Sequence, residues 1–187
     1  MDLVEDFDIE KVQTEGSNVV LKSKEIVSVD PDSADQAVNN IHEACEPHFE
    51  DGSHNLLIHL GVNAGICEIN LEKQAKNVKN FCIPDSQGNI YRDQKIDEDC
   101  DLRDLLHCKI DIDSICTNLK ESDHSCSHSK DAGEYLCNYI YYCSLKKFNE
   151  CENVNSIFIH VPQFSSLEKS KQLDCIYDFI KNWINQR

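Results

Sequence analysis

Two short apolar runs, one in each half of the chain, place the strongest limit on the fold. Residues 55–60 (NLLIHL) end at Gly61, and residues 156–161 (SIFIHV) end at Pro162. Each run is continuously apolar rather than alternating, which is typical of a strand covered on both faces of a sheet. We therefore expect two central strands in a sheet that has helices on both of its faces.

Amphipathic segments around these runs predict the helices. The clearest covers residues 32–47, where Asp32 or Ser33 is the expected N-cap and apolar residues recur every three or four positions. Further helices are expected over residues 113–119, 135–145 and 167–185. Because strands alternate with helices, the pattern predicts an α/β fold.

Three other stretches have weaker signals. Residues 18–29 are rich in β-branched side chains and predict a strand nearer the sheet margin. Residues 74–103 have little periodicity and predict a long irregular excursion, and the polar residues 120–130 predict a surface linker. A chain of 187 residues with 40% hydrophobic content can bury one core, so we expect one domain over residues 1–187.

The charge of the chain excludes several classes of partner. Lys and Arg number 18 against 34 Asp and Glu, so the net charge of −16 disfavours binding to nucleic acid or to anionic membranes. No apolar run approaches the roughly 20 residues that cross a bilayer. The acidic start MDLVEDFDIE does not resemble a signal peptide, and the 11 cysteines lack tight paired spacing. We therefore expect reduced thiols and a cytosolic location.

Cys137 is the first candidate for chemistry. It follows the sequence Asp-Ala-Gly and lies in the first turns of the helix predicted over residues 135–145. Free backbone N–H groups and the helix dipole at such a position lower the pKa of a thiol. A buried core cysteine is the alternative, since free cysteine is among the most buried residue types.

His160 is the second candidate. It lies at the C-terminal end of the strand predicted over residues 156–161, where open α/β sheets place their ligand crevices. A Cys–His pair from neighbouring elements activates a thiolate for attack on an acyl carbon. The alternative is a core histidine with satisfied hydrogen bonds, and His59 at the end of the other run has the same two interpretations.

The segment HSCSH is a third candidate. In an extended conformation, His124, Cys126 and His128 would face one way and offer ligand types that zinc accepts. This predicts a zinc-responsive protein, and the alternative is a solvated loop. The acidic residues 97–101 are most simply a solvated charged face.

Four short motifs resemble those of the pyroglutamyl peptidase I family, the C15 cysteine peptidases. DAGEYLCNYIYYCSL (residues 131–145) resembles the segment with the nucleophile, and FIHVP (residues 158–162) resembles the segment with the catalytic histidine. LEKQAKN (residues 71–77) resembles the Glu-x-x-Ala-x-Asn pattern, and IPDSQGN (residues 83–89) resembles the Ile-Pro-Asp-x-x-Gly-Asn loop. The motifs occur in the family's order, and the resemblance extends roughly from Asn18 to the C-terminus.

The resemblance implies a catalytic trio. Cys137 would be the nucleophile, His160 the general base and acid, and Glu72 the residue that orients the imidazole. Backbone N–H groups at the start of the helix would bind the oxyanion of an acyl-enzyme route. The implied activity is that of an omega peptidase that removes N-terminal pyroglutamate from peptides.

The resemblance also sets expectations for fold, cofactors and partners. It implies a three-layer α/β/α sandwich with a mostly parallel central sheet, of the phosphorylase/hydrolase-like type. No metal or organic cofactor is needed, and the expected partners are peptides with N-terminal pyroglutamate. A homo-oligomer is expected because exposed sheet edges favour association and because the family often assembles.

The start of the chain departs from the family's pattern. Members begin with a strand and a Gly-Phe-x-Pro-Phe type loop, and nothing like it precedes Asn18, so we expect a domain that is N-terminally truncated relative to the family. The alternative function is a noncatalytic homologue that binds or regulates. Residues 146–155 predict a surface loop. Glu134 would oppose thiolate formation if its carboxylate faced Cys137.

Overall fold

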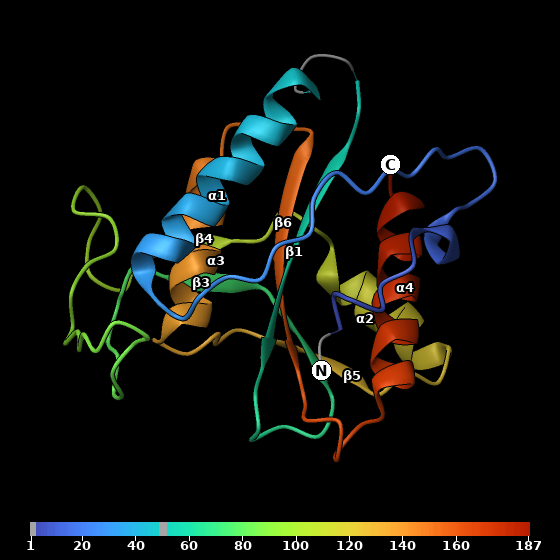
Figure 1. Cartoon of the computed structure of the whole chain (residues 1–187). Helices are drawn as coiled ribbons and strands as arrows, with labels where there is room; N and C mark the ends of the chain where they lie inside the picture. The colour runs from blue at the N-terminus through green and yellow to red at the C-terminus, as the bar shows by residue number, and fades with distance from the viewer. Residues whose placement is uncertain (1–2, 49–51) are drawn as a thin grey trace.

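A four-stranded sheet forms the centre of the computed structural model, which describes residues 3–48 and 52–187 (Figure 1). The strands lie in the order β1-β6-β2-β5, with bounds β1 Asn55–Val62, β6 Val154–Val161, β2 Ile69–Glu72 and β5 Cys126–Ser129. A separate antiparallel pair joins β3 Gln74–Lys76 and β4 Leu105–His107. The helices are α1 Pro31–Cys45, α2 Ile112–Glu121, α3 Leu136–Lys147 and α4 Lys169–Ile184, with 3₁₀ turns η1 Ile9–Val12 and η2 Glu46–His48.

The pairing of the central sheet is mostly parallel. β1 runs parallel to β6 from the pair Asn55 and Val154 to the pair Val62 and Val161. β2 runs parallel to β5 and antiparallel to β6. The predicted mostly parallel sheet is therefore confirmed, with one antiparallel junction at its centre.

The alternation of side chains along β6 defines the three layers. All eight residues of β6 are buried. Ile157 and Ile159 point into the cluster that contains the buried faces of α2 and α4, whereas Phe158 packs with residues of α1 and α3. Figure 1 shows α1 and α3 on one side of the sheet and α2 and α4 on the other. The predicted α/β/α sandwich is confirmed.

α1 and α2 each begin where an aspartate side chain accepts from a backbone N–H of the first turn. The N-cap of α1 is Asp30, whose Oδ1 accepts from the backbone N–H of Ser33 at 2.8 Å, and Pro31 follows as the first helical residue. The expectation of Asp32 or Ser33 as the cap was therefore wrong by two or three residues. The other three predicted helices are confirmed as α2, α3 and α4. Within the described ranges, no helix combines the length and the hydropathy needed to cross a bilayer.

β1 lies at the edge of the sheet, which corrects the prediction of a central strand. Among the strands that the structure describes, it pairs with β6 alone, and most of its residues are only half-buried. Val62 at its end is 66% exposed. A continuous apolar run shows that both faces of a strand are covered, but it does not show whether both edges are paired. The prediction of a central strand is confirmed for β6.

Local pattern also misjudged all or part of four connecting segments. Residues 18–29 form no strand, and Ile26 is 72% exposed. The predicted linker at residues 120–130 contains β5, and residues 74–103 are largely irregular but begin with β3. The first part of the predicted loop at residues 146–155 is the end of α3. Short strands depend on distant partners, so local sequence pattern predicts them poorly.

Candidate active site

A buried histidine–glutamate pair lies on the face of the sheet that α1 and α3 cover. In the antiparallel junction Asn70 is opposite His160 and Glu72 is opposite Phe158, so His160 and Glu72 are diagonal neighbours on one face. Nδ1 of His160 lies 2.8 Å from Oε1 of Glu72. Both residues are buried, with exposed fractions of 6% and 1%. The carboxylate can therefore hold the imidazole in one orientation and tautomer.

Cys137 lies over the same part of the sheet. It is the second residue of α3 and is half-buried. A side-chain carbon on Gly61 would lie 3.1 Å from Sγ of Cys137 and 2.6 Å from Cζ of Phe158, so only glycine leaves room here. Gly61 is the register partner of His160. The structure thus brings together Cys137, His160 and Glu72, the three residues that the resemblance singled out.

The surroundings of His160 favour its protonated form. Burial by itself lowers the pKa of this imidazole, but hydrogen bonds with Cys137 and Glu72, together with their charges, outweigh burial and raise the pKa to about 9. The protonated ring has an N–H on each nitrogen, so it can donate to Glu72 and to Cys137 at once. At neutral pH the pair therefore holds a proton that can be delivered to a leaving group.

The start of α3 offers unpaired donors beside the thiol. Tyr135 precedes the helix and makes no side-chain cap. The first intrahelical bond runs from the N–H of Tyr139 to the carbonyl of Tyr135. Within residues 3–48 and 52–187, the backbone N–H groups of Leu136, Cys137 and Asn138 have no acceptor. Such donors can stabilise a developing oxyanion next to Sγ.

Two buried polar side chains hold α3 against the segment that carries Glu72. The Tyr141 hydroxyl donates to the carbonyl of Glu72 at 2.8 Å. Oδ1 of Asn138 accepts from the N–H of Lys76 at 2.8 Å, and its Nδ2 donates to the carbonyls of Lys76 and Val78 at 2.9 and 3.0 Å. The sequence motifs do not identify these positioning roles. The available signal was an asparagine in a helix that is otherwise apolar nearly all round, because a buried amide needs partners.

The loop at residues 83–89 supports the same helix start. Oδ1 of Asp85 accepts from the backbone N–H groups of Gln87 and Asn89, which closes the turn. The Tyr135 hydroxyl donates to the carbonyl of Pro84 at 3.1 Å. This motif of the resemblance therefore has a structural role two residues from the nucleophile.

The carboxylate of Glu134 is paired with two polar side chains. Its carboxylate accepts from Nδ2 of Asn80 at 2.9 Å and from Nε of Arg103 at 3.3 Å. These hydrogen bonds, that of Asn80 first, lower the pKa of Glu134. The carboxylate is thus anionic and paired with these two side chains.

His59 does not join the trio. Burial lowers its pKa to about 4, so the ring is neutral at physiological pH. It stacks on Phe158 with ring centroids 6.3 Å apart. Its Nε2 is buried and has no hydrogen-bond partner in the part of the chain that the structure describes. The structure therefore supports a packing role for this histidine, but not the satisfied hydrogen bonds that the core interpretation expected.

The HSCSH segment does not converge on a common point. Nε2 of His124 lies 2.8 Å from Asp178 of α4, and Nδ1 of His128 lies 3.0 Å from Asp113 of α2. Cys126 lies between them in the hydrophobic core. Among the described residues, no group of three or more His, Cys, Asp and Glu could hold a metal ion. The zinc-site hypothesis is therefore not supported.

The acidic run at residues 97–101 is only partly a solvated face. Asp97 is 7% exposed, and its Oδ2 pairs with Nζ of Lys146 at 2.7 Å. Nδ2 of the buried Asn77 donates to the Asp97 carbonyl, and Oδ1 of Asn77 accepts from the Asp97 N–H. The expectation was wrong for this residue because a buried asparagine and a lysine from α3 fix the loop.

Comparisons with known proteins agree with the fold and the motifs. The family model described as pyroglutamyl peptidase matches residues 9–174. A pyrrolidone-carboxylate peptidase of Thermosipho africanus is 29% identical over 158 residues, which is 79% of this chain and 76% of the relative. One from Yersinia pestis is 32% identical over 108 residues, 57% of this chain and 49% of the relative, so the match spans about half the length of that protein.

Solved structures show the same architecture. The pyrrolidone carboxyl peptidase of Thermococcus litoralis superposes with a TM-score of 0.82 and 23% identity over 98% of this chain and 84% of that chain. A variant from Pyrococcus furiosus gives a TM-score of 0.82 and 22% identity over 98% and 89% of the two chains. At this identity the likeness concerns the fold, while the family model extends over most of the sequence. The chain belongs to the pyroglutamyl peptidase family.

Proposed function

We propose that this protein is a cysteine omega peptidase that removes N-terminal pyroglutamate from peptides. The observation that carries the proposal is the convergence of Cys137, His160 and Glu72 at the start of α3. Sγ lies over the register pair Gly61 and His160, and Glu72 holds the far nitrogen of the imidazole. Nucleophile, proton carrier and orienting carboxylate are the groups that an acyl-enzyme route requires.

The first half of the reaction transfers the pyroglutamyl group to sulfur. The Cys137 thiolate attacks the carbonyl carbon, and the backbone N–H groups at the start of α3 receive the oxyanion. His160 donates its proton to the leaving amine, the carbon–nitrogen bond breaks, and a thioester remains on Cys137. Glu72 stabilises the imidazolium throughout, as its 2.8 Å contact with Nδ1 allows.

The second half of the reaction regenerates the site. His160, now neutral, takes a proton from water, and the resulting hydroxide attacks the thioester carbon. The carbon–sulfur bond breaks, pyroglutamic acid leaves, and the thiolate–imidazolium pair is restored. Apart from the substrate and the water molecule, every group in these reaction steps belongs to the chain. The lactam of the substrate is uncharged, so backbone partners and apolar contacts suffice to bind it.

The proposal extends to domain, location and assembly. We take residues 1–187 as one domain built on the central sheet, and we place it in the cytosol, where its 11 free cysteines stay reduced. We also propose self-association, because within residues 3–48 and 52–187 β1 pairs on one side only, and an unpaired strand edge favours contact with a second copy. Analytical ultracentrifugation of the purified chain tests self-association by measuring its mass in solution.

The activity is tested by hydrolysis of a fluorogenic pyroglutamyl amide under reducing conditions. The chain should cleave it, and Cys137→Ala should not, while keeping the melting temperature of the parent. The same amide of proline is the matched substrate control, since it lacks the lactam carbonyl. Stabilisation of the folded chain by pyroglutamyl peptides without any cleavage would replace the proposal with the noncatalytic alternative.

A further inference from the structure

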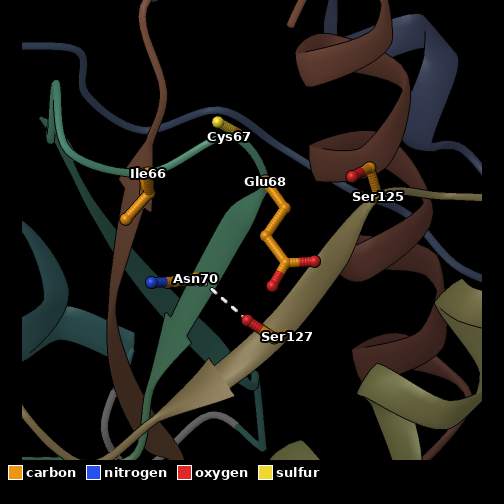
Figure 2. A pocket seen from close by; sticks show the side chains of 6 residues that line it. All are labelled: Ile66, Cys67, Glu68, Asn70, Ser125 and Ser127. Carbon is orange, nitrogen blue, oxygen red and sulfur yellow. Dashed lines mark hydrogen bonds between the residues drawn. The ribbon is translucent and has the colours of Figure 1, made fainter. Parts of the chain in front are cut away.

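A pocket of about 370 Å³ lies on the catalytic face of the sheet, where the loop before β2 meets the start of β5 (Figure 2). Oδ1 of Asn70 accepts from the Ser127 hydroxyl at 2.8 Å across its floor. The lining residues are Ile66, Cys67, Glu68, Asn70, Ser125 and Ser127. None of these six residues takes part in the proposed acyl transfer or in the hydrolysis of the thioester.

Strand register places this pocket beside the proton donor. Gly61 pairs with His160, His160 with Asn70, and Asn70 with Ser127, so these four residues form one row across β1, β6, β2 and β5. Neighbouring strands lie roughly 4.8 Å apart, and paired residues point to the same face. Cys137 lies over the first member of the row and the pocket over the last two. His160 separates them.

The order Cys137, His160, pocket matches the direction in which the cleaved peptide must extend from the sulfur. The acyl group ends on Cys137, and the departing amine takes its proton from His160, so the amine must lie on the His160 side of the sulfur. The peptide that follows this amine continues along the row toward Asn70 and Ser127. The pocket is therefore within reach of the residue that follows pyroglutamate.

The lining of the pocket selects by charge. Its polar groups are a carboxylate, an amide and hydroxyls, and none of the six side chains is cationic. In the part of the chain that the structure describes, Glu68 forms no hydrogen bond or ion pair, and its side chain is half-buried. Figure 2 shows the carboxylate extending over the space between β2 and β5. A half-buried carboxylate without a counter-charge favours a cation and opposes an anion.

We propose that this pocket binds the side chain of the residue that follows pyroglutamate, and that Glu68 gives the enzyme a preference for Lys or Arg at that position. The inference rests on the proposed function and adds a specificity site to it. Asn70 and Ser127 form the floor, and their mutual hydrogen bond fixes the amide; Nδ2 of Asn70 has no acceptor among the described residues and can bind the substrate backbone.

The test compares kcat/KM for three peptides that differ only in the second residue: pyroglutamyl-lysine amide, pyroglutamyl-alanine amide and pyroglutamyl-glutamate amide. The parent chain should prefer the lysine peptide over the glutamate peptide by about tenfold, because Glu68 attracts the lysine ammonium and repels the glutamate carboxylate, and each partly screened interaction contributes about threefold. Glu68→Gln should reduce this ratio to about twofold. Glu150→Gln is the matched control. Glu150 is exposed and precedes the first residue of β6, at the end of the strand away from His160, so this variant should keep the parent ratio.

Two results would overturn the inference: an equal ratio in the parent, or a ratio that Glu68→Gln leaves unchanged. Failure of the proposed function is seen separately, as absence of cleavage of the fluorogenic pyroglutamyl amide. In that case calorimetric titration of Cys137→Ser with the same three peptides decides the question. Tighter binding of the lysine peptide that is lost in the Cys137→Ser, Glu68→Gln double variant supports the pocket, and equal or absent binding contradicts it.

Discussion

The segment before α1 and the elements that carry the candidate site are held in the fold by different means. Residues 3–29 contain one short 3₁₀ turn, and Ile26 and Val20 are 72% and 57% exposed. Their attachment is local: Val12 is buried against the α4 layer, and the Tyr177 hydroxyl accepts from the Asp8 N–H at 3.0 Å. In contrast, every residue of β6 is buried.

This difference shows which part of the chain supplies the chemistry. The trio and its supports come from β1, β2 and β6, which are strands of one sheet, and from α3, which packs on one face of that sheet. Figure 1 shows the first segment running from the α4 side of the molecule to the start of α1. Within the described residues, the hydrogen bonds made directly by Glu72, His160 and the start of α3 do not involve this segment, although its last residue, Val29, accepts from the N–H of Ser86 in the loop at residues 83–89. Changes in the two regions should therefore have separable effects.

The largest effect is expected from Glu72→Gln. The amide keeps the shape of the side chain but removes the charge that stabilises the imidazolium and selects its tautomer, so kcat should fall by about 10³- to 10⁴-fold. Steady-state kinetics on the fluorogenic amide measures this loss. Glu121→Gln at the exposed end of α2 is the control, and a similar kcat for both variants would show that the buried pair is not part of the chemistry.

The pH dependence of activity and stability tests the pairing of His160 with Glu72 and Cys137. Because the pKa of His160 is raised to about 9, kcat/KM should fall as the pH rises through about 9. The folded pKa lies above the ordinary value of 6.5, so the stabilisation that His160 provides is complete below pH 6.5 and is lost between there and about pH 9. Urea unfolding across this range measures it. A basic limb near pH 6.5 would contradict the paired geometry.

Gly61→Ala probes the close approach of β1 to α3. The added methyl group would lie 2.6 Å from Cζ of Phe158 and 3.1 Å from Sγ of Cys137, so we expect a loss of about 1–3 kcal/mol in unfolding free energy and a lower kcat. Gly65→Ala is the matched control, because its nearest neighbour is the Asn63 side chain at 3.3 Å. Equal stability of the two variants would show that α3 does not approach the sheet as closely as described.

The smallest effects come from a matched pair of tyrosines. Tyr141→Phe leaves the buried Glu72 carbonyl without its donor, and we expect a loss of about 1 kcal/mol with a measurable drop in kcat. Tyr177→Phe removes the contact with Asp8, and we expect at most a similar loss of stability with kcat unchanged. A drop in kcat for Tyr177→Phe as large as that for Tyr141→Phe would remove the distinction between the two regions.

The sequence allowed prediction of the features that local patterns determine. The apolar repeats of α1 and α4 and the continuous run of β6 identified these elements near their observed positions. The edge position of β1 and the strands β2 and β5 were missed, since four-residue strands such as INLE and CSHS form through pairing with distant partners. Residues 18–29 carry a β-type pattern but have no strand partner in the described part of the chain.

The candidate site shows the same division. Cys137 and His160 were singled out from their expected places at a helix start and at a strand end, and Glu72 came from the resemblance alone. The supports could not be predicted, because the roles of Tyr141 and Asn138 depend on how α3 crosses the segment after β2. The roles of the trio in catalysis stay a prediction until they are measured.

Covalent labelling with a pyroglutamyl chloromethyl ketone tests the central claim most directly, because the reagent reports which of the 11 cysteines reacts at the site that binds pyroglutamate. We predict one equivalent of label on Cys137 by peptide mapping, with complete loss of activity and much slower labelling in Glu72→Gln. Label spread over exposed cysteines such as Cys67 and Cys82, with activity retained, would contradict the account.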